Sequence, residues 1–360
     1  MKKKVLSILF CAMLAASTVL GCSSKTEKED TKNQNTKSAT EETSKVEAEA
    51  VDIKQVYVTP EWVQSVIDGN QDESDNYVIL ECSWGTKKDS PVYGEAHIPG
   101  AYHMNTDNIE EDQNWNIRSG GEIEKVLTDF GITKDTTVIC YGDTGVNSAD
   151  DRVAFTALWA GVENVKCLDG GMEAWTKAGY DTEEGSNEPK AAKEAFGIEV
   201  PAHPEYILTI DQVKEKQESD DKFRLVSIRS KDEFLGKTSG YSYIEKAGEP
   251  KGAIWGHDTD DGSYLDKDGN TVGTDVLKSY LFESDASLDD DLAFYCGTGW
   301  RAAIPFLIMY QEGYTNMSMY DGGWFVWQKD DSNPVQIGDP ANDDVEYTTV
   351  EELSNDKAKK

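Results

Sequence analysis

Short apolar runs alternate with longer stretches of helical length along most of the chain. Apolar runs of strand length occupy residues 77–82, 136–141 and 165–168, separated by the stretches 121–130 and 149–160, which have the length of helices. The alternation returns at residues 225–228, 275–282, 292–295, 301–310 and 317–320. Strands and helices that alternate over short connections predict an α/β fold with mostly parallel sheets covered by helices on both faces.

The second half of this pattern repeats the first. The stretch Leu168-Asp169-Gly170-Gly171 with Trp175 recurs as Tyr320-Asp321-Gly322-Gly323 with Trp327, an offset of 320 − 168 = 152. The dipeptide Gly100-Ala101 recurs as Gly252-Ala253 at the same offset, 252 − 100 = 152. A constant offset between matching motifs indicates two copies of one fold. We predict a first domain at 51–183, a linker at 184–203, a second domain at 204–340 and a polar tail at 341–360 that frays.

The beginning of the chain has the pattern of an export signal. Met1 and three lysines precede a 16-residue apolar stretch from Val5 to Leu20, shorter than the about 20 residues of a membrane-spanning helix. The following Leu20-Gly21-Cys22 resembles a bacterial lipoprotein box. We therefore predict a signal peptide at 1–21, lipid on Cys22, a disordered tether at 22–50 and a membrane-anchored location outside the cytoplasm. The alternative is an ordinary secreted protein that is cleaved nearby.

The charge of the chain limits its partners. The formal net charge is 35 − 68 = −33, and removal of residues 1–21 with their three lysines takes it to −36. Such an acidic chain is not expected to bind nucleic acid or to dock on anionic lipid through charge. Any attachment to a membrane would depend on the lipid.

The candidate nucleophile is Cys296. It follows the apolar run 292–295 and opens the turn Cys296-Gly297-Thr298-Gly299-Trp300-Arg301, after which an apolar stretch of helical length begins. A tight turn with glycines, placed before a helix, points backbone N–H groups into one concavity that favours an anion. We therefore expect Cys296 to act as a thiolate nucleophile, although a lone cysteine elsewhere would more often be packing.

The spacing of the turn, C-x4-R, resembles the active-site loop of the rhodanese sulfurtransferases, and Cys296-Gly297-Thr298-Gly299 resembles the start of that loop in mercaptopyruvate sulfurtransferases. Cysteine-dependent phosphatases use a loop one residue longer. The stretch 95–101, which contains His-Ile-Pro-Gly-Ala, and both Asp-Gly-Gly elements resemble the same family. The resemblance covers roughly residues 55–335 and implies two tandem rhodanese-like domains. It also implies that the first domain is inactive, because Gly142 stands where the second domain has Cys296.

The resemblance implies sulfur transfer through a persulfide on Cys296, with the N–H groups of residues 297–301 cradling the outer sulfur. The donor would be thiosulfate or 3-mercaptopyruvate, both small anions, and the acceptor cyanide or a thiol. Trp300 and Arg301 replace the Val-Thr usual in mercaptopyruvate sulfurtransferases, and Glu233 stands where two-domain enzymes have a substrate-binding arginine, so the match to mercaptopyruvate is weaker.

The chain has only five arginines, which makes each informative. Arg301 closes the loop and is a candidate for donor binding. For Arg229 two roles stay open: contact with the substrate, or support of the loop through Glu233. Arg118 could reach across the domain cleft, whereas Arg152 fits a structural role better.

The remaining chemistry-bearing residues suggest packing. Cys82, Cys140 and Cys167 fall on strands of the first domain and fit core thiols better than a disulfide, and His257 fits a turn residue better than an acid or base. No motif for haem, zinc or a nucleotide occurs, so we expect no cofactor and no metal. Two rival functions stay open: a lipoprotein that binds sulfide or persulfide without turnover, and a cysteine-dependent phosphatase or arsenate reductase.

Overall fold

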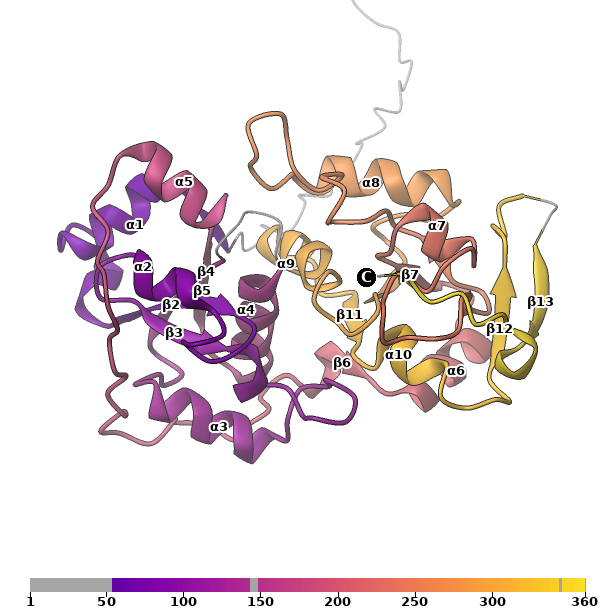
Figure 1. Cartoon of the computed structure of the whole chain (residues 1–360), viewed down its shortest axis with the longest axis horizontal. Helices are drawn as coiled ribbons and strands as arrows, with labels where there is room; N and C mark the ends of the chain where they lie inside the picture. The colour runs from indigo at the N-terminus through magenta and orange to yellow at the C-terminus, as the bar shows by residue number, and fades with distance from the viewer. Residues whose placement is uncertain (1–53, 143–147, 343–344, 360) are drawn as a thin grey trace, which may run out of the picture. The chain divides into compact units, whose positions relative to one another are not determined.

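The computed structural model of the protein describes residues 54–142, 148–342 and 345–359, which belong to one compact unit (Figure 1). The signal peptide and the tether predicted at 1–50, with Cys22, lie outside the described residues. Within the described residues, no helix is both long enough and apolar enough to cross a membrane.

The first domain is a five-stranded sheet in the order β1-β5-β4-β2-β3, and all neighbouring strands are parallel. Helices cover both faces, as the sequence predicts. One face packs its apolar residues, such as Ile79 and Tyr141, under α1 and α5, and the other packs Leu80 and Val138 under α3 and α4. The strands are β1 (Tyr57–Val58), β2 (Tyr77–Ser83), β3 (Tyr102–Asn105), β4 (Thr137–Gly142) and β5 (Asn164–Leu168). The helices are α1 (Pro60–Ile67), α2 (Pro91–Glu95), α3 (Gly120–Asp129), α4 (Ala149–Ala160) and α5 (Gly171–Ala178).

The second domain repeats this topology. Its parallel sheet has the order β6-β11-β10-β7-β9, which matches the first sheet strand for strand and confirms the internal repeat. The strands are β6 (Ile207–Leu208), β7 (Phe223–Ser227), β9 (Ile254–Trp255), β10 (Asp291–Tyr295) and β11 (Met317–Tyr320). The helices are α6 (Ile210–Ser219), α7 (Lys231–Phe234), α8 (Thr274–Glu283), α9 (Ala303–Gln311) and α10 (Gly323–Trp327).

Residues 346–353 of the predicted polar tail are part of the folded second domain, so the prediction that this stretch frays is wrong. Strand β13 (Glu346–Thr349) pairs antiparallel with β12 (Pro334–Ile337), which pairs in turn with β8 (Glu249–Pro250). Val350 and Leu353 bury their side chains in the core of the second domain. Two apolar anchors and a strand are enough to fix a segment in which most other residues are polar.

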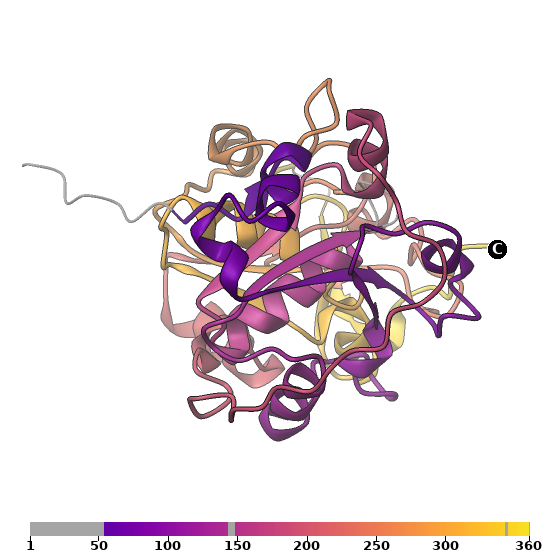
Figure 2. The ribbon, with the colours of Figure 1, turned by 90° about the vertical axis from the view of Figure 1, so that its left-hand side faces the viewer.

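Segment 183–202 lies along the first domain. Its backbone bonds to that domain at several points, including Glu183 to His97 and Ala192 to Thr128, and Figure 2 shows it following the outside of the domain. The segment therefore docks on the first domain along its length.

Helices α4 and α9 pack against each other and join the two domains. Every residue of α4 is buried, and residues 303–309 of α9 are buried too. The rings of Phe155 and Phe306 meet edge to face with their centroids 4.7 Å apart. A helix that is buried on all sides belongs in the middle of a molecule, and here it makes the interface between the domains part of one continuous apolar core.

Candidate active site

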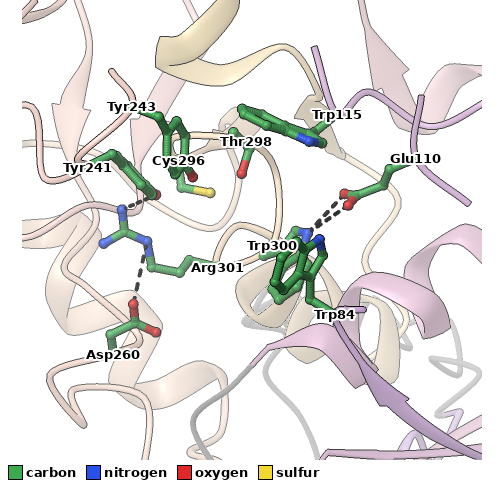
Figure 3. A pocket seen from close by; sticks show the side chains of 10 residues that line it. All are labelled: Trp84, Glu110, Trp115, Tyr241, Tyr243, Asp260, Cys296, Thr298, Trp300 and Arg301. Atoms are coloured by element: carbon green, nitrogen blue, oxygen red, sulfur yellow. Dashed lines mark hydrogen bonds and ion pairs between the residues drawn. The ribbon is translucent and has the colours of Figure 1, made fainter. Parts of the chain in front are cut away.

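Cys296 lies directly after β10, where the carboxyl end of the strand opens into a cavity of about 450 Å³ (Figure 3). The cysteine is only 1% exposed, and its Sγ accepts a hydrogen bond from the Gly299 N–H at 3.2 Å. The turn that follows leads into α9, whose N-terminus contributes a partial positive charge. A sulfur anion on Cys296 would thus meet a backbone donor inside a shielded pocket.

The two loop glycines are required by close approach and by backbone conformation. Gly299 has φ +97°, and a Cβ there would lie 2.7 Å from Nη1 of Arg152. A Cβ on Gly297 would lie 2.3 Å from the ring of Tyr241. Only a residue without a side chain fits either position, and the left-handed backbone of Gly299 turns its N–H toward the sulfur.

The start of α10 holds the loop from behind. The Trp324 N–H donates to the Cys296 carbonyl at 2.8 Å, and the Phe325 N–H donates to the Gly297 carbonyl at 3.0 Å. The first N–H groups of a helix have no acceptor within the helix, so those of α10 are available to bond the carbonyls of the Cys296 turn, which has left the sheet. The second Asp-Gly-Gly element, which precedes α10, thereby serves to fix the nucleophile.

A buried ionic network supports the loop from the side. Arg301 donates to both carboxylate oxygens of Glu233 at 3.0 Å and to Asp258 at 2.8 Å. Arg229 contacts Glu233 at 3.3 Å and Glu249 at 2.7 Å. Burial alone would raise the pKa of Glu233, but the charges of Arg301 and Arg229 outweigh it and hold that pKa at about 2. Glu233 is therefore a stable anion that pins both arginines.

The first domain supplies a second network on the other side of the loop. Arg152 of α4 donates to Glu110 at 2.9 Å and forms an ion pair with Asp321 of the second domain at 2.6 Å. Glu110 also accepts from the Trp300 indole N–H at 2.9 Å. Burial raises the pKa of Glu110 to about 7, against the opposing charge of Arg152. Its carboxyl group therefore titrates near neutral pH.

Aromatic side chains make most of the pocket wall. Trp115 has a left-handed backbone, with φ 57°, and its ring lies 4.9 Å from that of Tyr243, which in turn lies 5.2 Å from Tyr241. A tryptophan held in this uncommon conformation indicates that the direction of its side chain matters. The lining comprises Trp84, Glu110, Trp115, Tyr241, Tyr243, Asp260, Cys296, Thr298, Trp300 and Arg301.

The arginines predicted as site residues have different roles in the structure. Arg301 lines the pocket, but its guanidinium group is occupied by Glu233, Asp258 and Tyr241, so the structure favours loop support over free donor binding. Arg229 is fully buried and has the same supporting role.

Arg118 does not reach the cleft, so that prediction is wrong. Its guanidinium group donates to the backbone carbonyl of Asp107 at 3.1 Å and pairs with the carboxylates of Asp112 and Glu122 on the surface of its own domain. These nearby acids, six residues before and four residues after Arg118, hold the side chain there.

The other candidates occupy structural positions. Cys82, Cys140 and Cys167 are buried thiols in the first sheet, and burial raises the pKa values of Cys82 and Cys167. His257 stacks between Trp255 and Tyr280 and contacts Glu283 at 3.1 Å. Within the described part of the chain, no cluster of His, Cys, Asp or Glu could hold a metal ion.

Sequence reasoning missed the aromatic and acidic lining. Trp84, Glu110 and Trp115 come from the first domain, and Tyr241 and Tyr243 come from a loop about 55 residues before the cysteine. None of them lies in a recognisable motif. The one available signal was position, because Trp84 directly follows a strand and the carboxyl ends of parallel strands are where α/β folds build their sites.

Comparisons with known proteins agree with this geometry. A family model described as the rhodanese-like domain matches residues 59–178 and 209–330. The thiosulfate sulfurtransferase YnjE of Escherichia coli is 37% identical over 293 residues, which cover 79% of this chain and 66% of YnjE, so the chain spans just under two thirds of that relative. The thiosulfate/3-mercaptopyruvate sulfurtransferase 2 of Arabidopsis thaliana is 30% identical over 71% of this chain and 81% of its own length.

Solved structures give the same result. The crystal structure of YnjE superposes with a TM-score of 0.73 at 36% identity and covers 79% of this chain and 68% of that one. A structure of EanB, described as a cysteine persulfide in a tetrahedral intermediate state with ergothioneine, superposes with a TM-score of 0.74 at 32% identity. It covers 80% of this chain and 72% of the EanB chain.

Proposed function

Since the chain belongs to the rhodanese family of sulfurtransferases and contains two rhodanese-like domains in tandem, we propose that it moves sulfane sulfur from thiosulfate or a related donor to cyanide or a thiol. The carrier is a persulfide on Cys296. The family relationship supports the reaction class, and the choice of donor and acceptor is part of the proposal.

The reaction has two displacement steps. The Cys296 thiolate attacks the outer sulfur of thiosulfate, the S–S bond of the donor breaks, and sulfite leaves with the electron pair. Cyanide or a thiolate then attacks the outer sulfur of the persulfide, and the electron pair of that S–S bond returns to Cys296. Splitting the transfer in this way is nucleophilic covalent catalysis, and no external oxidant or reductant is consumed.

The observation that carries the proposal is the hydrogen bond from the Gly299 N–H to the Sγ of Cys296, a side chain that is almost completely buried at the base of the pocket. Fixed donors aimed at a developing anion, in a site that excludes water, stabilise that anion without reorganisation during the reaction. Because Gly299 and Gly297 cannot carry side chains, the loop is built for this conformation. The relatives named as thiosulfate sulfurtransferases support the same chemistry.

The first domain has no nucleophile at the position of Gly142, and we propose that it acts as the second wall of the pocket. Its Glu110 holds the Trp300 indole, and its Arg152 holds Asp321 beside the loop. These contacts place acids and aromatic rings of one domain against the nucleophile of the other. We therefore expect neither domain alone to transfer sulfur at the rate of the whole chain.

Intact-protein mass spectrometry of the full chain tests the mechanism. After incubation with thiosulfate, we expect a mass gain of one sulfur atom that cyanide removes as thiocyanate. The Cys296→Ala variant should show no gain, while Cys140→Ala, which removes a buried thiol of the first domain, should load normally. Loading of the Cys296→Ala variant would refute the mechanism. Loading of the wild type without repeated turnover would favour the sulfur-binding alternative.

We further propose that the mature chain is a lipoprotein anchored through Cys22 outside the cytoplasm. The basic start, the 16-residue apolar stretch and the Leu20-Gly21-Cys22 sequence support this location. In a bacterial host, labelled palmitate should enter the wild-type protein and not a Cys22→Ala variant, and only the wild type should sediment with membranes. Equal labelling of both proteins would contradict the anchor.

A further inference from the structure

The pocket around Cys296 is poorly suited to holding an anion by charge. Arg301 is the one basic residue among its described lining residues, and three carboxylates surround it: Glu233 at 3.0 Å, Asp258 at 2.8 Å and Asp260 at 3.9 Å. A guanidinium group with this many acid partners has no surplus positive charge for a ligand. An anionic group deep in the pocket would rely on the backbone of the loop alone.

The rest of the lining has the composition of a cation site. Five aromatic side chains, which are Trp84, Trp115, Tyr241, Tyr243 and Trp300, surround the cavity. Two acids complete this part of the lining: Glu110, which shares Arg152 with Asp321, and Asp260, which shares Arg301 with Glu233 and Asp258. Aromatic faces attract an onium group through the ring quadrupole, and a cage of several rings is the usual way in which proteins bind quaternary ammonium. Figure 3 shows these side chains drawn around one opening, with the sulfur of Cys296 pointing toward it.

Trp300 and Tyr241 pack against the cores of the two domains, but other aromatic residues of the lining are exposed. Trp84 is 64% exposed and Tyr243 is 48% exposed, although both are large apolar side chains. Trp115 keeps a left-handed backbone, and its carbonyl accepts from Arg152 at 3.1 Å, which fixes that conformation. Exposed rings held in place around a cavity indicate a ligand that covers them.

We propose that the physiological sulfur acceptor of this enzyme is a thiol whose molecule also carries a quaternary or alkylated ammonium group. The ammonium group lies among the rings of Trp84, Trp115 and Trp300, and the thiol points to Cys296. This inference rests on the proposed function, because it names the acceptor of the same persulfide.

The transfer balances without another reactant. The acceptor thiolate attacks the outer sulfur of the Cys296 persulfide, the S–S bond to Cys296 breaks, and its electron pair returns to the cysteine as a thiolate. The product is the persulfide of the acceptor. The acidic lining favours the cation of the acceptor, and the loop N–H group favours the sulfur anion, so the two ends of the molecule are oriented in opposite directions.

Two compounds of nearly equal shape distinguish the effect of a ligand's positive charge from the effect of its size. Choline carries a trimethylammonium group, and 3,3-dimethylbutan-1-ol carries a neutral tert-butyl group in its place. With the full chain, thiosulfate and cyanide, we expect choline to inhibit thiocyanate formation at a concentration at least tenfold lower than the alcohol. Equal inhibition by the two compounds, or no inhibition by either, would overturn the proposal.

A second pair of compounds tests acceptance of sulfur. Thiocholine should receive sulfur from the loaded enzyme with a kcat/KM at least tenfold above that of 3-mercaptopropionate, after each is corrected for its uncatalysed reaction with a small persulfide. In Trp84→Leu the ratio of the two kcat/KM values should fall severalfold, because leucine keeps an apolar side chain at this position but has no aromatic ring face. Phe282→Leu, which changes a 78% exposed ring on α8 away from the pocket, is the matched control and should keep it. Preference for 3-mercaptopropionate would overturn the inference.

Failure of the two proposals can be told apart. If thiosulfate does not load Cys296 and no thiocyanate forms, the proposed function fails. Binding of choline can still be followed by tryptophan fluorescence in Cys296→Ser, which keeps the pocket. If thiocyanate forms at a normal rate and choline does not change the fluorescence, the sulfurtransferase stands and the onium acceptor is refuted.

Discussion

Replacing Glu233 by Gln should destabilise the whole second domain, because this carboxylate neutralises two buried arginines at once. Its pKa lies at about 2 instead of the ordinary 4.5, and at about 1.4 kcal/mol for each tenfold change in proton affinity this corresponds to about 3 kcal/mol. Breaking a buried ion pair by removal of one partner costs a similar 3–5 kcal/mol in general. Gln keeps the size of the side chain and the hydrogen bond to the Ser230 N–H, so the loss reports the charge.

Urea unfolding of the purified full chain, followed by circular dichroism, measures the effect. We expect Glu233→Gln to lower the free energy of unfolding at pH 7 by about 3 kcal/mol, with a fall in Tm of roughly 6–10 °C. Glu245→Gln is the control, because Glu245 is 62% exposed and only reaches Lys357 at 3.4 Å. It should change stability by less than about 0.5 kcal/mol.

The same variant has a predictable pH dependence. The folded-state pKa of Glu233 is lowered, so the stability that this group contributes is fully present above its unfolded pKa of about 4.5 and disappears as the pH falls toward 2. The difference between wild type and Glu233→Gln should therefore shrink in acid. A variant that stays within 1 kcal/mol of wild type at pH 7, or a difference that grows in acid, would refute the account of the network.

Three further outcomes follow from the geometry. Gly299→Ala should lose at least tenfold in thiocyanate formation and about 2 kcal/mol in stability, since its Cβ would lie 2.7 Å from Arg152 at φ +97°; activity near wild type would contradict the assigned loop conformation. Arg118→Ala should have kcat and KM for thiosulfate within about twofold of the wild-type values, because the ion pairs of Arg118 are on the surface. A large rise in KM would show that Arg118 contacts the donor after all. Burial raises the pKa of Glu110 to about 7 against the opposing charge of Arg152, so its carboxyl group gains negative charge between pH 6 and 8. Choline inhibition should therefore strengthen about three- to tenfold over that range, and an unchanged or reversed trend would contradict the part of Glu110 in the pocket.

The sequence predicts most of the framework because local signals agree with the packing. The range 149–160 coincides with α4, and 317–320 coincides with β11. A stretch of helical length was enough for α4, and an apolar run of strand length before an Asp-Gly-Gly turn was enough for β11. By contrast, β8 (Glu249–Pro250) has only two residues and no periodicity, so the antiparallel sheet that it forms with β12 and β13 gave no signal.

The pocket is less predictable for a different reason. Cys296 has a local signature, because its loop must turn in a fixed number of residues, but the lining depends on contacts between residues that are far apart in the sequence. Glu110 and Trp300 are 190 positions apart and share a hydrogen bond. Neither residue type is unusual in its own segment. They meet where the two domains pack together, beside contacts such as α4 with α9 and Arg152 with Asp321, and such contacts leave no motif in the sequence.

The retention of the first domain can be understood from the same packing. Trp84 follows the carboxyl end of β2, and Cys296 follows the carboxyl end of β10, so the two sheets present the same edge to one cavity. The first domain carries Gly142 at the position of Cys296, so the use of that edge here is to line the cavity. Arg152 indicates that use, because a fully buried arginine bonded to Glu110 in its own domain and paired with Asp321 in the other would be costly to keep unless both acids stay in place. Arg152 therefore ties the first domain to the Cys296 loop by charge, and the first domain contributes Trp84 and Trp115 to the wall of the pocket.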